Sequence, residues 1–209
     1  MLVQLQKIIK DFDLHIKGVI HVGAHHGQEY PDYVAAGIEN MMFFEPVKSN
    51  YKKLLEVVKV SNKVRTFNLA LGNYTGKAEM FIETANNGQS CSLLEPGSHL
   101  DTYPKIVFDG KEIVDISKLD ILDFEKSDFN MIDMDVQGYE LEVFKGAVET
   151  LHFIDIIYTE INMSAVYKNC CVVGELDAFL ALYGFERVLT HMAHPTWGDA
   201  LYIKNKKTK

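Results

Sequence analysis

The chain has 209 residues, which is enough for one domain with a substantial hydrophobic core. A hydrophobic content of 47% and a charged content of 24% are those of an ordinary globular protein. The net charge of −8 argues against a protein that binds nucleic acid by neutralising its phosphates, and it leaves a small neutral or cationic ligand open. Residues 204–209 are strongly basic, and we interpret them as a solvated tail.

Cysteine usage and the N-terminal pattern bear on the compartment. The three cysteines, Cys91, Cys170 and Cys171, are odd in number and lack the C-x-x-C spacing of a metal site, which favours a reducing compartment. Apolar residues within 1–13 recur at helical spacing, which predicts an amphipathic helix rather than a secretory signal. No apolar run reaches the length of a membrane span. We therefore expect a cytoplasmic protein.

The first strand and the turn after it suggest a ligand site. A short apolar run at 19–22 stops at Gly23, and a helix is predicted over 28–36. In an open α/β sheet, the end of such a strand is where nucleotide-like ligands bind. His25 stands where a dinucleotide-binding motif needs its second glycine, which counts against a nicotinamide oxidoreductase. No Gly-Lys-Ser/Thr sequence follows, so the turn is not a P-loop.

The second predicted strand, 41–44, ends at Glu45-Pro46, and a helix is expected over 49–60. Glu45 lies 22 residues after Gly23. This is close to the offset of about 20 residues at which an acidic side chain accepts hydrogen bonds from a ribose. A solvated loop carboxylate is the simpler alternative, but the position at the end of an apolar strand favours ribose binding.

The middle of the chain predicts an excursion from this alternating pattern, at about 73–115. Its turn-rich loop, 84–104, has a length that is usually associated with function or mobility. The expected elements of this region are strands at 64–70, 77–83 and 107–114 and a short helix within 116–124.

The next strand, 129–135, carries two acidic residues in an apolar run. Asp133 and Asp135 are two residues apart, so both face the same side of the sheet. Burying a carboxylate costs free energy unless it is paired or bound. Asp135 lies at the carboxyl end, where ligands bind, whereas Asp133 is deeper and is either satisfied internally or a ligand contact. A helix is predicted over 139–151.

The last part of the chain completes the expected sheet. A strand over 153–161 ends near Glu160 and Asn162, and a helix is expected over 172–183. The final strands, predicted at 185–190 and 199–204, are joined by a short loop at 191–198 and must therefore be antiparallel. If the first of them is parallel to the rest of the sheet, this loop, with His191, His194 and Trp197, lies on the ligand side.

Several stretches, taken together and in this order, carry a resemblance to a known family. They are residues 19–24, Phe44-Glu45-Pro46 with Asn50 and Leu54, residues 68–72, residues 135–147 and, more weakly, residues 159–162 and 197–202. The most specific stretch begins Asp135-Val136-Gln137-Gly138-Tyr139. The chain resembles the FkbM-type family of S-adenosylmethionine (SAM)-dependent methyltransferases.

The resemblance implies an α/β, Rossmann-like class I methyltransferase fold. Its seven-stranded sheet has six parallel strands and one antiparallel strand, with helices on both faces, and residues 1–209 would form a single domain. Gly23 and Ala24 would approach the methionine part of the cofactor, and Glu45 its ribose. The full set of implied cofactor contacts is His21, Gly23, Ala24, Glu45, Pro46, Asn68, Ala70, Leu71 and Asp135, of which Asn68, Ala70 and Leu71 would lie near the adenine.

His21 departs from the family, which usually has Asp at this position. An Asp there could help to hold the cofactor's ammonium group, whereas a protonated His would repel it. We expect His21 to be neutral and either to accept a hydrogen bond or simply to be packed. The neighbouring His25 and His26 are interpreted as cofactor-loop or lid residues.

The expected chemistry is methylation of a hydroxyl, which requires alignment of the acceptor and removal of its proton. The candidates for the base are Asp135, Glu160 and His194. Asp135, Glu160 and Asn162 could alternatively supply oxygen ligands to Mg2+. The residues expected to contact the acceptor are Ser90, Ser92, Tyr167 and Trp197.

We therefore predict a SAM-dependent O-methyltransferase acting on a sugar, another small molecule or a glycan, with no nucleic-acid partner. The alternative is a non-catalytic domain that keeps the cofactor pocket and serves as a binding or assembly partner. The departure at His21 supports this alternative, whereas the intact Glu45 and Asp135 argue against it.

Overall fold

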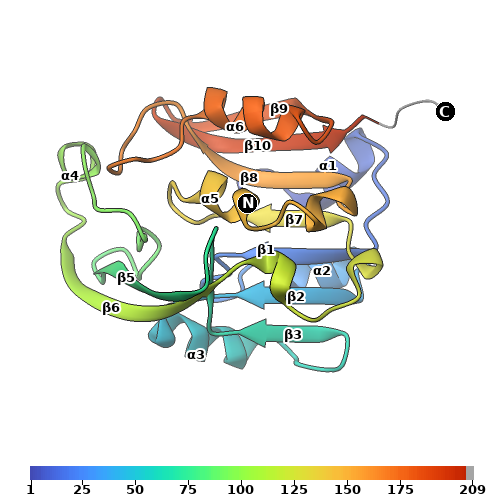
Figure 1. Cartoon of the computed structure of the whole chain (residues 1–209), viewed down its shortest axis with the longest axis horizontal. Helices are drawn as coiled ribbons and strands as arrows, with labels where there is room; N and C mark the ends of the chain where they lie inside the picture. Colours follow the sequence, from blue (N-terminus) through green and yellow to red (C-terminus); the bar gives the residue numbers. More distant parts are fainter. Residues whose placement is uncertain (206–209) are drawn as a thin grey trace.

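The computed structural model describes residues 1–205. Within them, seven strands form one sheet in the middle of the molecule (Figure 1). Residues 206–209 of the expected basic tail lie outside this range. The strand order is β3-β2-β1-β7-β8-β10-β9, and β10 runs antiparallel to both of its neighbours while the other six strands are parallel. The predicted fold class is confirmed. The strands are β1 (Gly18–Val22), β2 (Asn40–Phe44), β3 (Val64–Phe67), β7 (Met131–Met134), β8 (Ile156–Asn162), β9 (Phe185–His194) and β10 (Trp197–Lys204).

The central strand β1 is apolar on both faces because it is buried between two layers. Val19 belongs to the core cluster on one face, and Ile20 and Val22 belong to the cluster on the other. Both neighbouring strands pair with β1 in parallel, so that Val22 lies between Phe44 and Met134. A parallel strand that is covered on both sides needs such a near-continuous apolar run.

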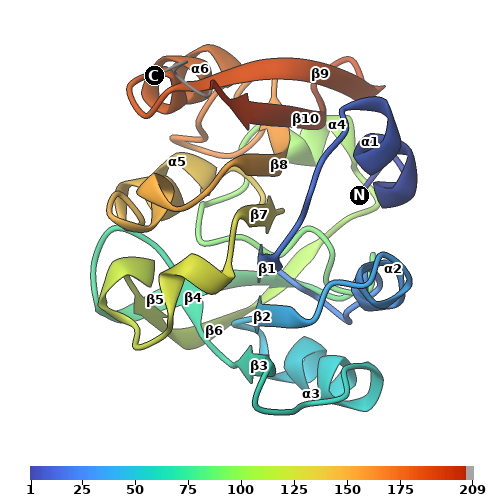
Figure 2. The ribbon, with the colours of Figure 1, turned by 90° about the vertical axis from the view of Figure 1, so that its right-hand side faces the viewer.

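Helices cover both faces of the sheet, as Figure 2 shows with the strands seen nearly end-on. One layer is made of α1 (Leu5–Asp11), α2 (Tyr30–Ala35) and α3 (Lys48–Val57), and the opposite layer contains α5 (Glu140–Lys145) and α6 (Val173–Ala181). Each layer has its own apolar core. The buried helix residues that join these cores are Leu5, Ile8, Tyr33 and Leu54 on the first side and Val143, Phe144, Leu176 and Leu180 on the second.

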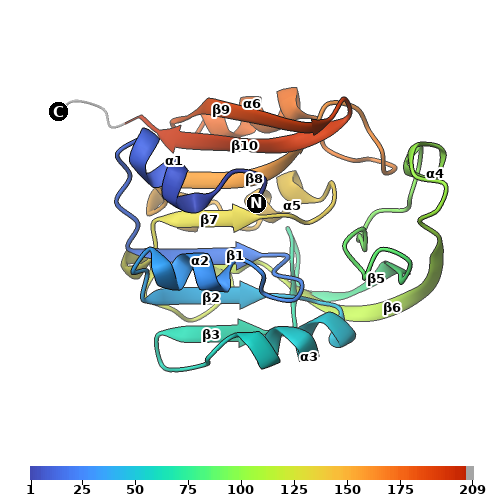
Figure 3. The same cartoon turned by 180° about the vertical axis from the view of Figure 1, so that it is seen from behind.

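The order of the strands creates a crevice beside β1. From β1 the chain proceeds to β2 and β3 on one side, whereas β7 and β8 lie on the other side. The connections therefore diverge at the carboxyl ends of β1 and β7, and ligands of open α/β sheets bind at such a point. Figure 3 shows these ends facing the part of the chain that follows β3.

That part of the chain forms a small second sheet, made of β4 (Ala70–Leu71), β6 (Phe108–Ser117) and β5 (Gly76–Glu83) in that spatial order. β5 and β6 pair antiparallel along most of their length. In Figures 1 and 3, this sheet and the short helix α4 (His99–Thr102) extend beyond the carboxyl ends of the main strands. The excursion after β3 is therefore placed to cover the crevice.

The helix expected over 139–151 is wrong in its length. It ends at Lys145 as α5, and a separate 3-10 turn, η3 (Thr150–His152), follows. The reason is a close approach of two backbone segments, because a Cβ on Gly146 would lie 1.9 Å from the carbonyl oxygen of Gly72. Further 3-10 turns are η1 (Leu119–Ile121), inside the predicted 116–124 helical region, and η2 (Lys126–Asp128).

The strand expected over 64–70 is also too long. β3 ends at Phe67, and the chain joins the second sheet at Ala70. Between them, the side chain of Asn68 donates from Nδ2 to the carbonyl oxygens of Glu45 and Pro46, at 2.9 and 2.8 Å. These two hydrogen bonds hold the chain against the end of β2 and turn it out of the main sheet.

The loop expected over 191–198 is mostly strand. β9 continues to His194 and β10 begins at Trp197, so that Pro195 and Thr196 alone connect them. β9 is an edge strand and its side chains are largely exposed, so its polar composition resembles that of a loop. The register shifts between Trp197 and Gly198, where the strand pair is irregular.

No helix in the described part of the chain has both the length and the apolarity to cross a bilayer. Cys91, Cys170 and Cys171 are buried free thiols. The cytoplasmic location stays a prediction.

Candidate active site

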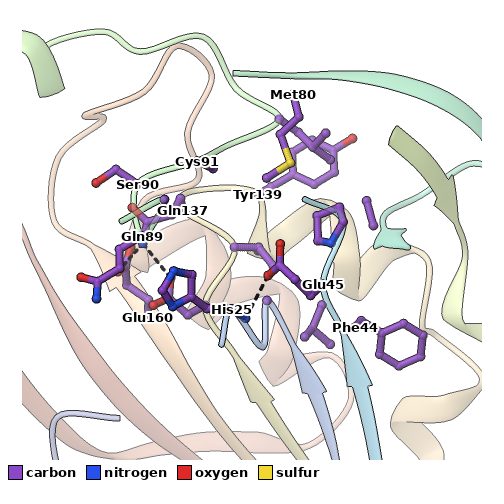
Figure 4. A pocket seen from close by; sticks show the side chains of 18 of the residues that line it. His25, Phe44, Glu45, Met80, Gln89, Ser90, Cys91, Gln137, Tyr139 and Glu160 are labelled. Atoms are coloured by element: carbon purple, nitrogen blue, oxygen red, sulfur yellow. Dashed lines mark hydrogen bonds between the residues drawn. The ribbon is translucent and has the colours of Figure 1, made fainter. Parts of the chain in front are cut away.

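A cavity of about 360 Å³ opens at the carboxyl ends of the central strands. This volume lies in the range of small-molecule sites, roughly 300–1,000 Å³. Its walls come from the ends of β1, β2, β7 and β8, from the second sheet and from the loops around residues 86–106 and 162–167. Figure 4 shows part of this lining, with Glu45 on one side and Gln137 and Glu160 on the other.

The turn after β1 is fixed by its backbone. Gly23 has a φ of 81°, and a Cβ there would lie 1.9 Å from the carbonyl oxygen of Asp135, so glycine is required for both its conformation and its size. The N–H groups of Gly23 and Ala24 both donate to the carbonyl oxygen of Phe44 at 2.9 Å. Gly23 lines the cavity, whereas Ala24 is buried in the core below it.

Glu45 lies at the end of β2, in the cavity wall. Its Oε1 accepts from the N–H of Val47 at 2.8 Å and its Oε2 from the N–H of His25 at 2.9 Å. Burial raises the pKa of Glu45 to about 8, and the two backbone hydrogen bonds oppose this effect. The carboxyl group is thus held rigidly by the backbone of two neighbouring loops. Pro46 lines the cavity beside it.

Apolar side chains form the wall around Glu45. Phe44, Leu69, Ala70, Leu71 and Met80 line this part of the cavity, and Tyr139 lies close to Met80 in Figure 4. Asn68, which was predicted to contact the adenine, does not line the cavity, because its amide is occupied by the backbone of Glu45 and Pro46.

A pair of carboxylates marks the other side of the cavity: Glu160 is buried, whereas Asp135 is exposed toward the cavity. The side-chain amide of Gln137 lies between them, because its Nε2 donates to Asp135 Oδ1 at 2.7 Å and to Glu160 Oε2 at 3.0 Å. Tyr167 donates to Gln137 Oε1 at 3.0 Å and to the carbonyl oxygen of Ser90 at the same distance. The structure thus brings together Asp135, Glu160, Tyr167 and Ser90, which were selected from separate parts of the sequence.

Proton affinity in this cluster is raised by burial and by mutual repulsion. Burial raises the pKa of Asp135 to about 6 and the pKa of the adjacent Glu140 to about 7. The pKa of Glu160 rises well above its ordinary value, first through burial and then through the negative charges of Asp135 and Glu140. The cluster therefore binds protons more readily than carboxylates in open solvent do.

Gln137 was not selected from the sequence, although it lies inside the most specific motif. Its φ of 54° turns the side chain back toward the strand end, and Ser92 Oγ donates to its carbonyl oxygen at 2.8 Å. Ser92 is fully buried and acts on this backbone; it does not line the cavity. The sequence gives little indication that the glutamine before Gly138 adopts a left-handed conformation.

His21 is packed, as one of the two expected alternatives has it, and it is also hydrogen-bonded, although as a donor and not as the expected acceptor. Its Nδ1 lies 2.9 Å from the hydroxyl oxygen of Tyr33, and this hydroxyl donates to Asp133. The ring packs against Tyr33 and Phe43. Burial raises the pKa of Asp133, and its carboxyl group is satisfied by Tyr33. His21 and Asp133 nevertheless both line the cavity.

Of the two histidines after Ala24, His25 lines the cavity at the β1 side, whereas His26 does not. His25, with a φ of 47°, lies within 2.8 Å of the carbonyl oxygen of Asn87 through Nε2, and His26 Nε2 lies 3.2 Å from Asn50 Oδ1. The two rings are stacked with their centroids 3.6 Å apart. His25 connects the loop after β1 to the loop at 84–92, and His26 connects it to α3. Their role as cofactor-loop or lid residues stays a prediction.

Trp197 and His194 lie in the C-terminal hairpin, and only the first of them reaches the cavity. Trp197 lines the cavity, and its Nε1 donates to the hydroxyl oxygen of Tyr103 at 2.8 Å. His194 does not line the cavity, and its Nδ1 lies 2.8 Å from Thr196 Oγ1 within the same turn. The cause is the continuation of β9, which takes His194 into the strand.

Asp135, Glu160 and Asn162 are the residues that were predicted to be able to hold a magnesium ion. In the part of the chain that the structure describes, no three side chains of His, Cys, Asp or Glu converge as a metal site requires. The space between Asp135 and Glu160 is filled by the amide N–H groups of Gln137, which are donors and do not bind a cation. These residues do not fit a magnesium ion as they are arranged, and no step below is routed through a metal.

The sheet order, the crevice and the cavity together define a class I methyltransferase fold. The model of the methyltransferase FkbM domain matches residues 21–187. The chain belongs to this family and is a SAM-dependent methyltransferase, so the resemblance seen in the sequence is confirmed.

A curated relative and two solved structures are also similar to this chain. The 2-O-methyltransferase NoeI of Sinorhizobium fredii (strain NBRC 101917 / NGR234) is 26% identical over 197 residues, which cover 90% of this chain and 79% of that protein. Magnesium protoporphyrin IX methyltransferase (ChlM) of Synechocystis PCC 6803, solved with bound S-adenosylhomocysteine (SAH), has a TM-score of 0.54 at 9% identity and covers 95% of this chain and 78% of its own.

Sp1610 of Streptococcus pneumoniae, described as a tRNA (m1A22) methyltransferase and solved with SAM, has a TM-score of 0.51 at 13% identity. The match covers 98% of this chain and 73% of that one. At these identities the shared property is the fold alone. Such neighbours include methyltransferases of RNA and of small molecules, so the fold does not identify the acceptor.

Proposed function

We propose that this chain transfers a methyl group to a hydroxyl oxygen of a sugar or a comparable small acceptor. The observation that carries the proposal is the Gln137-bridged pair of Asp135 and Glu160 at the edge of the cavity. A hydroxyl must lose its proton to be methylated; the pKa of Asp135 is raised to about 6, and the pKa of the buried Glu160 is raised well above its ordinary value. The 2-O-methyltransferase NoeI, as a relative, is consistent with transfer to oxygen.

The cavity fits the cofactor that the family implies. Glu45 would accept hydrogen bonds from the ribose hydroxyls, in the space that its backbone donors leave open. Phe44, Ala70, Leu71 and Met80 would enclose the adenine, and Gly23 would allow the methionine part to approach the backbone. When bound, SAM supplies a methyl group that its positively charged sulfur has already activated.

The residues of this chain then have two tasks. The first is alignment, because Gln137 fixes the two carboxylates and is itself fixed by Tyr167. The second is proton transfer. Asp135 accepts the proton of the acceptor hydroxyl, and Gln137 holds it beside Glu160, whose pKa is raised well above its ordinary value. Methyl transfer breaks one S–C bond and forms one O–C bond, and the proton leaves through the carboxylate pair.

Charge favours a small neutral acceptor over nucleic acid. The chain carries a net charge of −8, which would repel a phosphate backbone. We also propose that residues 1–209 act as one methyltransferase domain in which the excursion at about 73–115 covers the site.

The test is release of SAH from SAM in the presence of a panel of glycosides, with and without EDTA. The proposal predicts that at least one glycoside stimulates release, and that EDTA leaves the rate unchanged within about twofold. The opposite outcome is a purified chain that binds SAH by calorimetry and releases none with any acceptor class. That result would favour the non-catalytic alternative, whereas a rate abolished by EDTA would restore the metal.

A further inference from the structure

A polar side chain beside the carboxylate pair lacks partners within the described chain. Asn162 ends β8 two residues after Glu160, so the two side chains lie on the same face, about 7 Å apart along the strand. It lines the cavity and is 2% exposed. Within residues 1–205, neither its Nδ2 nor its Oδ1 has a hydrogen-bond partner. Because buried amides are almost always hydrogen-bonded, such a group in a cavity wall points to a ligand.

His99 provides a second group of this kind. It lies in α4, lines the cavity and is 4% exposed, and its Nδ1 has no hydrogen-bond partner among the described residues. Burial lowers the pKa of His99, which favours the neutral ring. The rings of Tyr103 and Tyr167 hold it in place, with centroids 5.1 and 5.2 Å away. His99 therefore presents one oriented polar atom from an otherwise aromatic surface.

An aromatic surface lies next to these two groups. Trp197 is paired directly with Asn162 across β10 and β8, so the two side chains are neighbours on one face of the sheet. The hydrogen bond from Trp197 Nε1 to Tyr103 joins it to the ring cluster around His99. A sugar ring has an apolar face of C–H groups and a polar rim of hydroxyls. A flat aromatic surface edged by an amide and an imidazole is complementary to both.

On the basis of the proposed transferase function, we infer that Asn162 binds the hydroxyl next to the one that is methylated, in an uncharged pyranoside. An amide offers a donor and an acceptor side by side, and a pair of vicinal hydroxyls can satisfy both. Asp135, joined to Glu160 through Gln137, accepts the proton of the neighbouring, reacting hydroxyl. His99 contacts a further polar group on the same ring, which lies over Trp197. The carboxylates of the site disfavour phosphorylated or carboxylated sugars.

The single tryptophan of the chain makes this inference directly measurable. Trp197 is the only tryptophan in the sequence, so its fluorescence reports on the space beside Asn162. With SAH saturating, the probes are the methyl pyranosides of glucose, galactose, mannose and rhamnose, their monodeoxy derivatives, and methyl glucuronoside. At least one neutral glycoside should change the emission saturably, and the glucuronoside should not. Removing either hydroxyl of the recognised pair should weaken binding by about tenfold or more.

The Asn162→Ala variant should bind the recognised glycoside about tenfold or more weakly and should lose the distinction between it and its deoxy derivative. Its SAH affinity, measured by calorimetry, should stay within about twofold. Asn162→Ser keeps a smaller polar group and should be intermediate. Asn205→Ala, at the far end of β10, is the matched control and should behave as the unmodified chain does.

Each other outcome overturns a defined part of the account. If folded Asn162→Ala binds the glycoside as tightly as the unmodified chain does, or keeps the same deoxy preference, Asn162 does not bind the acceptor. If SAH binds but no glycoside changes the fluorescence, the sugar subsite is wrong while the cofactor site stands. If SAH does not bind, the proposed function itself fails. Should Asn162→Ala not fold, Asn162→Ser and the deoxy series on the unmodified chain decide the question.

Discussion

The two ends of the cavity are built in different ways. At the β1–β2 end, backbone groups hold the site, because Gly23 and Ala24 donate to Phe44 and two backbone N–H groups fix the carboxyl of Glu45. At the β7–β8 end, side chains hold one another through Gln137, and the side-chain amide of Asn162 has no hydrogen-bond partner within residues 1–205. The first end is therefore formed by the sheet itself, whereas the second is completed by what binds there.

The largest effect is expected at the side-chain end. Asp135→Asn removes the proposed proton acceptor and should lower kcat for SAH release by about 100-fold or more. A steady-state assay with the best glycoside measures this effect. Asp11→Asn, at an exposed ion pair with Lys7, is the matched control and should retain full activity. An Asp135→Asn variant with more than half of the normal kcat would show that another group accepts the proton.

The backbone end should be most sensitive to added volume. Gly23→Ala places a Cβ against the carbonyl of Asp135 and should lower the free energy of unfolding by about 3 kcal/mol, from strain at positive φ and from overpacking. Gly37→Ala is the control, because Gly37 has a similar φ of 74° but no atom within 4 Å of its added Cβ. It should cost about 1 kcal/mol. Urea denaturation of both variants measures the difference, and equal losses would contradict the close approach.

Glu45 tests whether the backbone end binds the cofactor. Glu45→Gln keeps the size of the side chain but removes a charged acceptor, and it should weaken SAH binding about tenfold. Glu39→Gln, whose exposed carboxylate pairs with Lys63, should leave the affinity unchanged. Isothermal titration calorimetry measures the SAH affinity of both variants. An unaltered affinity in Glu45→Gln would place the ribose elsewhere.

A smaller effect follows from the raised pKa of Glu45, about 8. Ribose hydroxyls donate to the ionised carboxylate, so binding requires loss of its proton when the pH lies below this pKa. SAH affinity should therefore rise with pH up to about 8 and then level off, by at most about tenfold per pH unit. Calorimetry in buffers of different ionisation enthalpy should detect proton release on binding at pH 7. Glu45→Gln should reduce that release; a release as large in this variant would assign it to another group.

The smallest effect is expected at His194. Its side chain faces Thr196 and does not line the cavity, so His194→Ala should change kcat by less than about twofold. The same assay that is used for Asp135→Asn measures this, and a loss of about 100-fold would restore His194 as a base. In that case the C-terminal hairpin would take part in the chemistry.

The backbone end was largely predictable from the sequence, because its signals are local. An apolar run that stops at Gly23, and a carboxylate that follows the next run, are visible without any knowledge of tertiary structure. The fold class was implied by the resemblance of several stretches of the chain to the FkbM-type family. Helix α5 was predicted too long because its end depends on the approach of Gly72 to Gly146, which are far apart in the chain.

The side-chain end could be predicted in part. Asp135 and Glu160 follow their strands directly, but the position of Gln137 between them depends on a left-handed backbone that a glutamine rarely adopts. His99 reaches the cavity through the second sheet, and nothing near it in sequence indicates a site. Long-range placement of loop residues is the information that local patterns lack.

The central claim is that the cavity at the carboxyl ends of β1 and β2 binds the methyl donor through Glu45. Titrating SAH into the purified chain and into Glu45→Gln, with heat as the readout, tests it most directly. We predict saturable one-to-one binding to the unmodified chain and about tenfold weaker binding to the variant. No heat with either protein, or identical affinities for both, would contradict the claim.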